Sequence, residues 1–262
     1  MAQLAALDQR RAHEVLATLK NRADELGLEL LVIGATARDI KVALELGLGV
    51  ERATKDVDVA VHVDSFAIYH RFMSAFTRTT APQRVLVQEV SVDVVPFGDI
   101  ERDRKVQLEE GVVLDVVGLR EASRAADLTE ITPGVMVRVA SLEAQMVLKA
   151  TAWRDRAHGR RNKDAVDLAS LLEAADEGRH AEATWADEET MERFDYDPLQ
   201  AAAFRLGLGG ARLFETRTVA LRVLETFESP EWQSAVSRGL SALTARERLD
   251  AYTEGFRAGL PL

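Results

Sequence analysis

The sequence predicts an α+β fold: a small mixed β-sheet flanked by helices, followed by a helical region. Short valine-rich segments in the first half alternate apolar and polar residues, which is the period of a half-buried strand. Segments with apolar residues every three or four positions lie before and between them and indicate helices. Beyond residue 140 only helical patterns remain, so we expect two parts, residues 1–140 and residues 141–262.

In the first part, a leucine-rich helical pattern precedes Gly27, which is a natural helix stop. A buried strand then runs into Gly34, and a helix follows. Residues 99–110 are mostly charged, so we expect a loop or an exposed helix there. The expected helices are 3–26, 36–46 and 65–76, and the expected strands are 28–33, 56–63, 84–88, 90–95, 112–117 and 135–139.

In the second part, cap residues divide the helices. Ser141 precedes a helix over 142–156, and a second helix is expected over 163–175. The polar, acidic residues 179–197 are expected to form a linker. The remaining boundaries are set by Asp197-Pro198 and Gly207 around one helix, a further helix over 211–227, Ser229-Pro230, and a Thr244-x-x-Glu247 capping box before a helix over 245–258.

Composition excludes several classes of protein. The chain has 262 residues, of which 47% are hydrophobic and 29% charged, as in an ordinary globular protein. Without cysteine, it has no disulfide scaffold, zinc–thiolate site or thiol nucleophile. It lacks a signal-peptide pattern and an apolar run long enough for a bilayer, so we expect a cytoplasmic protein with no membrane partner. A net charge of −10 argues against coating nucleic acid through bulk charge, but permits a local basic patch.

Acidic residues recur on one face of two expected strands. In 56–63, Asp56 and Asp58 share a face with His62, while the valines occupy the other face. Asp93 repeats this arrangement in the strand 90–95. If the two strands are neighbours, three carboxylates converge and require a cation. Mg²⁺ is the usual ion, because it prefers oxygen ligands from carboxylates, phosphates and water.

The turn at Gly34-Ala35-Thr36 supplies the complementary half of a nucleotide site. Glycine between a strand and a helix lets backbone amides approach a phosphate, and a helix N-terminus favours negative charge. Thr36 adds a hydroxyl. The turn or the acidic pair alone has an ordinary structural explanation, as a connector or a solvated strand face. The turn, the pair and the third aspartate in this order favour a magnesium–nucleotide site.

The order Gly34-Ala35, Asp56-x-Asp58, Asp93 resembles the nucleotidyltransferase superfamily with the DNA polymerase β-type fold. Within it, the sequence is most similar to the AbiEii-type bacterial toxins, which include the MenT group. The resemblance implies transfer of a nucleoside monophosphate from a nucleoside triphosphate to an acceptor hydroxyl. It implies two Mg²⁺ ions on the three aspartates, a toxin-antitoxin or phage-defence role with a cognate antitoxin, and tRNA as acceptor.

The resemblance also assigns roles to residues later in the chain. Lys149, with Arg38, would neutralise the triphosphate, although a lysine that extends along apolar neighbours to solvent explains Lys149 equally well. In the segment Arg161-x-Lys163-Asp164-x-x-Asp167-Leu168, one acidic residue would join the active site. Asp164 is preferred narrowly over Asp167, and stabilisation of the helix N-terminus is the structural alternative. The nearby basic residues Arg154, Arg156, Arg160 and Arg161 would meet an RNA backbone.

Two other functions stay open. In the first, the acceptor is a protein hydroxyl or a small molecule such as an aminoglycoside. In the other, the chain is a catalytically silent binding protein, because Ala35 stands where the family usually has Gly or Ser. Arg52 and Lys55 either neutralise the carboxylates or touch phosphate. The five histidines lack the spacing of metal ligands, and His62 is expected to be structural.

Overall fold

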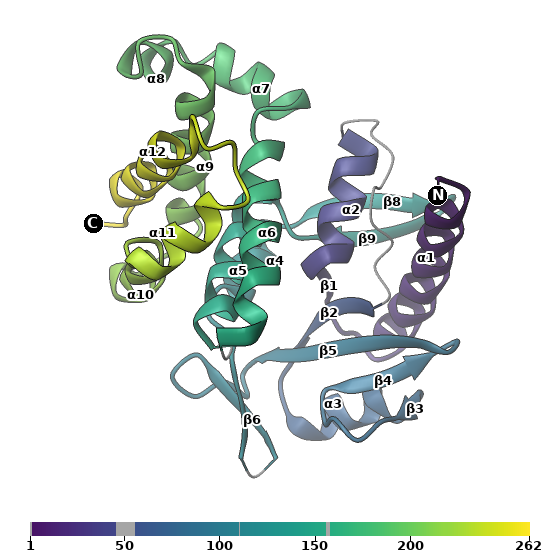
Figure 1. Ribbon diagram of the computed structural model, residues 1–262. Helices are drawn as coiled ribbons and strands as arrows, with labels where there is room; N and C mark the ends of the chain where they lie inside the picture. Colours follow the sequence, from purple (N-terminus) through teal and green to yellow (C-terminus); the bar gives the residue numbers. More distant parts are fainter. Residues whose placement is uncertain (1, 46–55, 110, 156–157) are drawn as a thin grey trace. The chain divides into compact units, whose positions relative to one another are not determined.

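The computed structural model describes the backbone of residues 2–45, 56–109, 111–155 and 158–262, and the side chains of residues 10–41, 56–109, 111–154 and 165–262. The chain divides into two compact units, Met1–Ser141 and Leu142–Leu262 (Figure 1). The first contains the strands and the second is helical, which confirms the predicted α+β fold class.

A mixed seven-stranded sheet organises the first unit, in the order β3-β4-β5-β2-β1-β9-β8. At its centre, β2 pairs in parallel with β5 and antiparallel with β1, and β1 pairs in parallel with β9. The outer pairs are antiparallel. In chain order the strands are β1 (Leu30–Ile33), β2 (Asp56–Val63), β3 (Thr77–Arg78), β4 (Arg84–Val87), β5 (Val90–Gly98), β8 (Asp127–Thr132) and β9 (Val135–Val139).

The valine face of the sheet is the core of this unit. The helices of the unit are α1 (Ala2–Glu25), α2 (Gly34–Glu45), α3 (Phe66–Met73) and α4 (Leu119–Arg124). Leucines and a valine of α1 and the aromatic side of α3 are buried against the strand valines. Tyr69 and Phe72 are therefore core residues, as the helical pattern predicts. Because successive strand residues face opposite ways, the polar residues of β2 and β5 lie on the other face.

Several regions of the first unit differ from expectation, including α4 and β3, which the sequence did not predict. The prediction of a loop or helix over 99–110 is wrong, because β6 (Lys105–Glu109) pairs antiparallel with β7 (Val112–Asp115) in a separate hairpin (Figure 1). In β6 the exposed residues Lys105, Gln107 and Glu109 alternate with the more buried Val106 and Leu108. The high polar content of the segment hid this strand period. Strand β8 was not predicted. It lies at the sheet edge, where Leu128 is 62% exposed, and β9 supplies its pairing.

The second unit consists of eight helices within the described residues. They are α5 (Leu142–Asp155), α6 (His158–Ala174), α7 (Gly178–Trp185), α8 (Glu188–Arg193), α9 (Pro198–Arg212), α10 (Arg217–Phe227), α11 (Pro230–Ser237) and α12 (Ala245–Ala258). The linker expected over 179–197 is wrong, because α7 and α8 occupy it. Asp187 caps α8 by accepting a hydrogen bond from the Thr190 amide.

The predicted helix caps of this unit have mixed outcomes. Asp197 accepts hydrogen bonds from the Leu199 and Gln200 amides, and Ser229 accepts one from Trp232, which confirms both starts. The capping box at Thr244 is wrong, since the Thr244 side chain makes no capping hydrogen bond.

Gly207 does not end α9, which continues to Arg212 and leaves α10 to begin at Arg217. A β-carbon on Gly207 would lie 2.0 Å from the Tyr252 carbonyl oxygen of α12, and one on Gly255 would lie 2.0 Å from the Phe204 carbonyl oxygen. These glycines therefore let two helix backbones approach each other, rather than stopping a helix.

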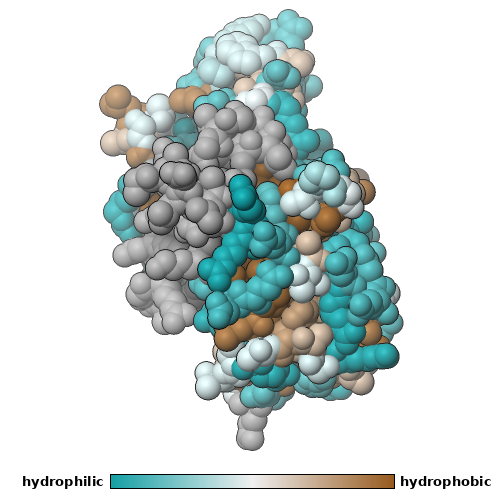
Figure 2. Space-filling view, turned by 90° about the vertical axis from the view of Figure 1, so that its right-hand side faces the viewer, coloured by the Kyte–Doolittle hydropathy of each residue, from teal (hydrophilic) through white to brown (hydrophobic). Residues whose placement is uncertain are grey.

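One face of the molecule is shown in space-filling form in Figure 2, where hydrophilic residues lie among the hydrophobic ones. Within the described parts of the chain, no helix combines the length and apolar character needed to cross a membrane.

Candidate active site

The acidic residues of β2 and β5 meet through strand register. Val57 and Val59 are buried at 1% exposure or less, whereas Asp58, between them, points to the opposite face and is partly exposed. Parallel pairing aligns Asp58 with Asp93 on β5. Aligned residues on neighbouring strands share a face, with backbones about 4.8 Å apart. The structure thus brings these two carboxylates side by side, with Asp56 two residues before Asp58.

Gly34 joins the turn to this row of carboxylates. Its φ is +65°, and it lies between the last residue of β1 and the body of α2. Ile33, the residue before it, is the cross-strand partner of Asp58. A β-carbon at position 34 would fall 2.3 Å from Asp58 Oδ2 and 2.9 Å from Asp58 Cβ. The backbone angle and the close approach both require glycine, so the turn touches the carboxylate directly.

The first turn of α2 presents a buried polar group. Thr36 is 4% exposed, and its hydroxyl oxygen has no hydrogen-bond partner among the residues that the structure describes. Buried hydroxyls are usually paired, so this group is a candidate ligand contact at a helix N-terminus. Arg38, by contrast, donates two hydrogen bonds to Asp39 Oδ1, at 2.7 and 3.0 Å. Its guanidinium is already engaged by a neighbouring carboxylate.

Arg84 is a candidate site residue that the sequence analysis did not identify. It lies on β4 directly opposite Asp93, and it donates from Nε to Oδ1 and from Nη2 to Oδ2, both at 2.7 Å. This hydrogen bonding and the charges of Asp93, Asp56 and Asp58 raise the pKa of Arg84. The available signal was that Arg84 opens the strand expected to pair with the Asp93 strand. Only the register places the two side chains opposite each other.

The residues present fit a magnesium ion in part. Among the side chains the structure describes, no three acidic, histidine or cysteine groups converge as a metal cluster, and the three aspartates form none. Asp93 instead has both oxygens on Arg84. Asp56 and Asp58 offer hard carboxylate oxygens, and Mg²⁺ is typically held by one or two carboxylates together with phosphate and water oxygens. This donor set suits one such ion.

Lys149 and Asp167 form an ion pair in the second unit. Lys149 Nζ on α5 donates to Asp167 Oδ2 on α6 at 2.6 Å, and the two side chains are 15% and 6% exposed. Lys149 is therefore held by a buried carboxylate, which is more than an extension along apolar neighbours. The structure joins Asp167 to Lys149, while the side chain of Asp164 lies outside the described residues.

The other basic residues predicted here are only partly described. Arg154 donates to the Arg222 carbonyl oxygen at 2.8 Å. Arg52, Lys55 and Arg156, and the side chains of Arg160 and Arg161, lie outside the described residues.

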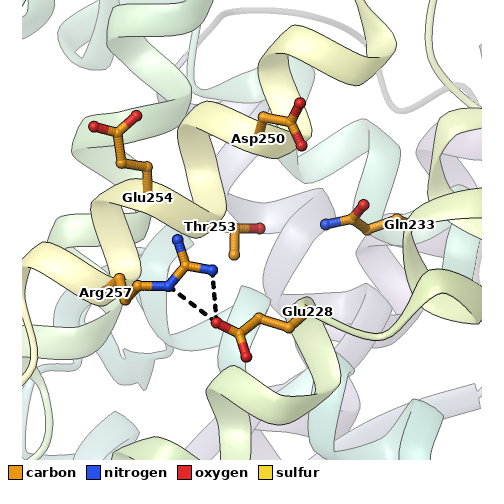
Figure 3. A pocket seen from close by; sticks show the side chains of 6 residues that line it. All are labelled: Glu228, Gln233, Asp250, Thr253, Glu254 and Arg257. Carbon is orange, nitrogen blue, oxygen red and sulfur yellow. Dashed lines mark hydrogen bonds and ion pairs between the residues drawn. The ribbon is translucent and has the colours of Figure 1, made fainter.

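An open cleft in the second unit has a different chemistry (Figure 3). Its volume is about 540 Å³, and Arg257 in it donates to Glu228 Oε1 at 3.0 and 2.6 Å. Three carboxylates, one arginine, one glutamine and one threonine line it: Glu228, Asp250, Glu254, Arg257, Gln233 and Thr253. Because its acidic groups outnumber its basic one, it does not suit a triphosphate.

A comparison with protein-family models identifies the relatives of the chain. The model described as "Nucleotidyl transferase AbiEii toxin, Type IV TA system" matches residues 18–255. The chain belongs to the AbiEii family. The match begins within α1 and ends within α12, so it includes both the carboxylate strands and the Lys149–Asp167 pair. This match confirms the resemblance. The AbiEii family consists of nucleotidyltransferase toxins of type IV toxin-antitoxin systems. Membership therefore implies an antitoxin partner and a nucleotide substrate. A search of curated proteins gives no match.

Proposed function

We propose that this AbiEii protein transfers a nucleoside monophosphate from a nucleoside triphosphate to an acceptor hydroxyl, with Mg²⁺ and with tRNA as acceptor. The contact between Gly34 and Asp58 is the observation that carries the proposal. It sets the N-terminus of α2 next to a carboxylate that suits a divalent ion. A triphosphate with its metal needs both in one place, because amides bind its oxygens while the ion offsets its charge.

The residues divide the work as follows. The backbone amides at Gly34 to Thr36 would orient the phosphates, with the Thr36 hydroxyl as a further donor. Asp56 and Asp58 would hold Mg²⁺, which when bound neutralises charge on the triphosphate and on the leaving pyrophosphate. The acceptor oxygen forms a bond to the α-phosphorus as the bond to pyrophosphate breaks, and Asp93 takes the hydroxyl proton. Positioning and charge neutralisation supply the rate, without a covalent enzyme intermediate.

In the second unit, we propose that Lys149 binds phosphate and that its acidic partner on α6 keeps it oriented. The 2.6 Å hydrogen bond to Asp167 supports this role, because a buried carboxylate fixes the lysine in one position. Asp164 keeps the same proposed role as the alternative acidic residue.

Incubation with each of the four α-labelled ribonucleoside triphosphates, Mg²⁺ and total tRNA tests the proposal. We expect label in the tRNA band from at least one nucleotide, and none when Mg²⁺ is chelated. Label on protein instead would correct the acceptor. Failure of all four nucleotides to label tRNA, protein or an aminoglycoside would overturn the proposed activity.

A further inference from the structure

Arg84 occupies a fixed place in a row of side chains across four strands. Cross-strand pairing aligns Arg84 on β4 with Asp93 on β5, Asp93 with Asp58 on β2, and Asp58 with Ile33 on β1. Gly34 follows Ile33 and touches Asp58. The guanidinium is thus one strand beyond the carboxylates, on the face that carries them.

Arg84 and Asp93 form a bidentate ion pair that engages both carboxylate oxygens. Two parallel hydrogen bonds of 2.7 Å join them, the arrangement in which arginine matches a carboxylate best. The Arg84 side chain is 40% exposed and that of Asp93 is 23% exposed, so the pair lies at the surface of the sheet face and is accessible to a ligand. The charges of Asp56 and Asp58 also act on Arg84.

We propose that Arg84 is a positioning residue that serves as the fixed cation of the site: it orients Asp93 and excludes a second divalent ion, so the site binds one ion on Asp56 and Asp58. This inference rests on the proposed function and sets its metal requirement at one ion, where the family resemblance implies two. Asp93 engaged by a guanidinium is a poor ligand for a further cation, because the positive charge of Arg84 repels it. Without Arg84, Asp93 would be a free carboxylate aligned with Asp58, and the pair would form a second ion site.

Metal counting on the full chain, without nucleotide, tests this inference. Mn²⁺ replaces Mg²⁺, and electron paramagnetic resonance measures free Mn²⁺ during titration. Asp56→Asn/Asp58→Asn provides the background. We expect the wild-type chain to bind one ion above that background, Arg84→Gln to bind two, and Arg84→Lys, which keeps the charge, to bind one. Lys105→Gln is the matched control, since it removes one charge from an exposed strand residue outside the row, and it should bind one.

The outcomes separate this inference from the proposed function. Two ions in the wild-type chain, or one ion in Arg84→Gln with unchanged affinity, would overturn the role of Arg84 while leaving a metal-dependent transferase intact. A wild-type chain that binds no more Mn²⁺ than the double variant would overturn the inference, whereas the transferase activity is tested separately by the labelling assay with nucleotide present. Circular dichroism of each variant verifies folding. If Arg84→Gln does not fold, two ions in Arg84→Lys or in the wild-type chain still contradict the inference.

Discussion

Gly34 and Asp58 lie so close together that a β-carbon on Gly34 would fall 2.3 Å from Asp58 Oδ2. The relationship joins the end of β1 to the acidic strand β2, and it supports our proposal that the turn and the Asp-x-Asp pair form one site. Any side chain at position 34 has to displace the carboxylate that we assign to the metal.

Gly34→Ala should therefore abolish nucleotidyl transfer, and Gly27→Ala is its matched control. Both glycines have a φ near +65°, but a β-carbon on Gly27 would have no atom of the described residues within 4 Å. The left-handed backbone costs alanine about 1–2 kcal/mol at either position. Urea unfolding should show that loss for Gly27→Ala with transfer preserved, and a larger loss for Gly34→Ala. Equal transfer by the two variants would contradict the importance of the contact.

The α9–α12 interface makes a second matched pair of glycines. A β-carbon on Gly207 would lie 2.0 Å from a backbone oxygen, whereas one on Gly210 would meet Phe256 at an ordinary 3.5 Å. Gly207→Ala should lower the free energy of unfolding by about 3 kcal/mol through overpacking. Gly210→Ala should raise it by about 0.5–1 kcal/mol, since alanine is the better helix former. Denaturant unfolding of both variants decides, and similar effects would show that the backbones can separate easily.

The strands and their polar faces could be predicted from the sequence, whereas the pairing between strands could not. The alternation in 56–63 and 90–95 predicts β2, β5 and their polar faces, because each strand buries only one side. The parallel register that aligns Asp58 with Asp93 joins residues 35 positions apart, and no local pattern encodes it. Arg84 lies only nine positions from Asp93, but its role depends on the register between β4 and β5, which the strand pattern alone does not fix. Edge strand β8 buries a single side chain, Ile131, so it leaves little periodic signal in the sequence. Gly207 resembles a helix stop in the sequence, and only the close approach of α12 explains it.

The Lys149–Asp167 pair is open to a double-mutant cycle. Removing one partner takes the 2.6 Å ion pair away from a buried charge, so Lys149→Met and Asp167→Leu should each cost about 3–5 kcal/mol of unfolding free energy. The double variant should cost less than the sum, because it removes both charges of the pair. Restored stability without nucleotidyl transfer would support a phosphate-binding lysine. Restored stability with full transfer would reduce the pair to a structural role.

Asp176 should make stability depend on pH. Burial raises the pKa of Asp176 to about 7, although the Arg248 guanidinium, 2.6 Å away, acts in the opposite direction. The folded state therefore holds a proton that the unfolded state releases near pH 4, and this group's contribution to stability falls as the pH rises from about 4 to 7. Asn cannot titrate, so the free energy of unfolding of Asp176→Asn should rise relative to that of wild type by about 1–2 kcal/mol as the pH goes from about 4 to 7. The change is smaller than full linkage would give, because Asp176 is partly solvated. Urea unfolding at pH 5 and pH 8 measures it, and a pH-independent difference would contradict the assignment.

The most direct measurement compares nucleotidyl transfer by Asp58→Asn and Asp64→Asn. Asp58 touches the glycine turn and aligns with Asp93, whereas Asp64 follows the same strand as an exposed residue outside the row. With labelled nucleotide, Mg²⁺ and tRNA, we expect Asp58→Asn to lose at least about a thousandfold in rate at unchanged stability, as loss of a metal-holding group implies, and Asp64→Asn to match wild type. Transfer by Asp58→Asn at the wild-type rate would contradict the account.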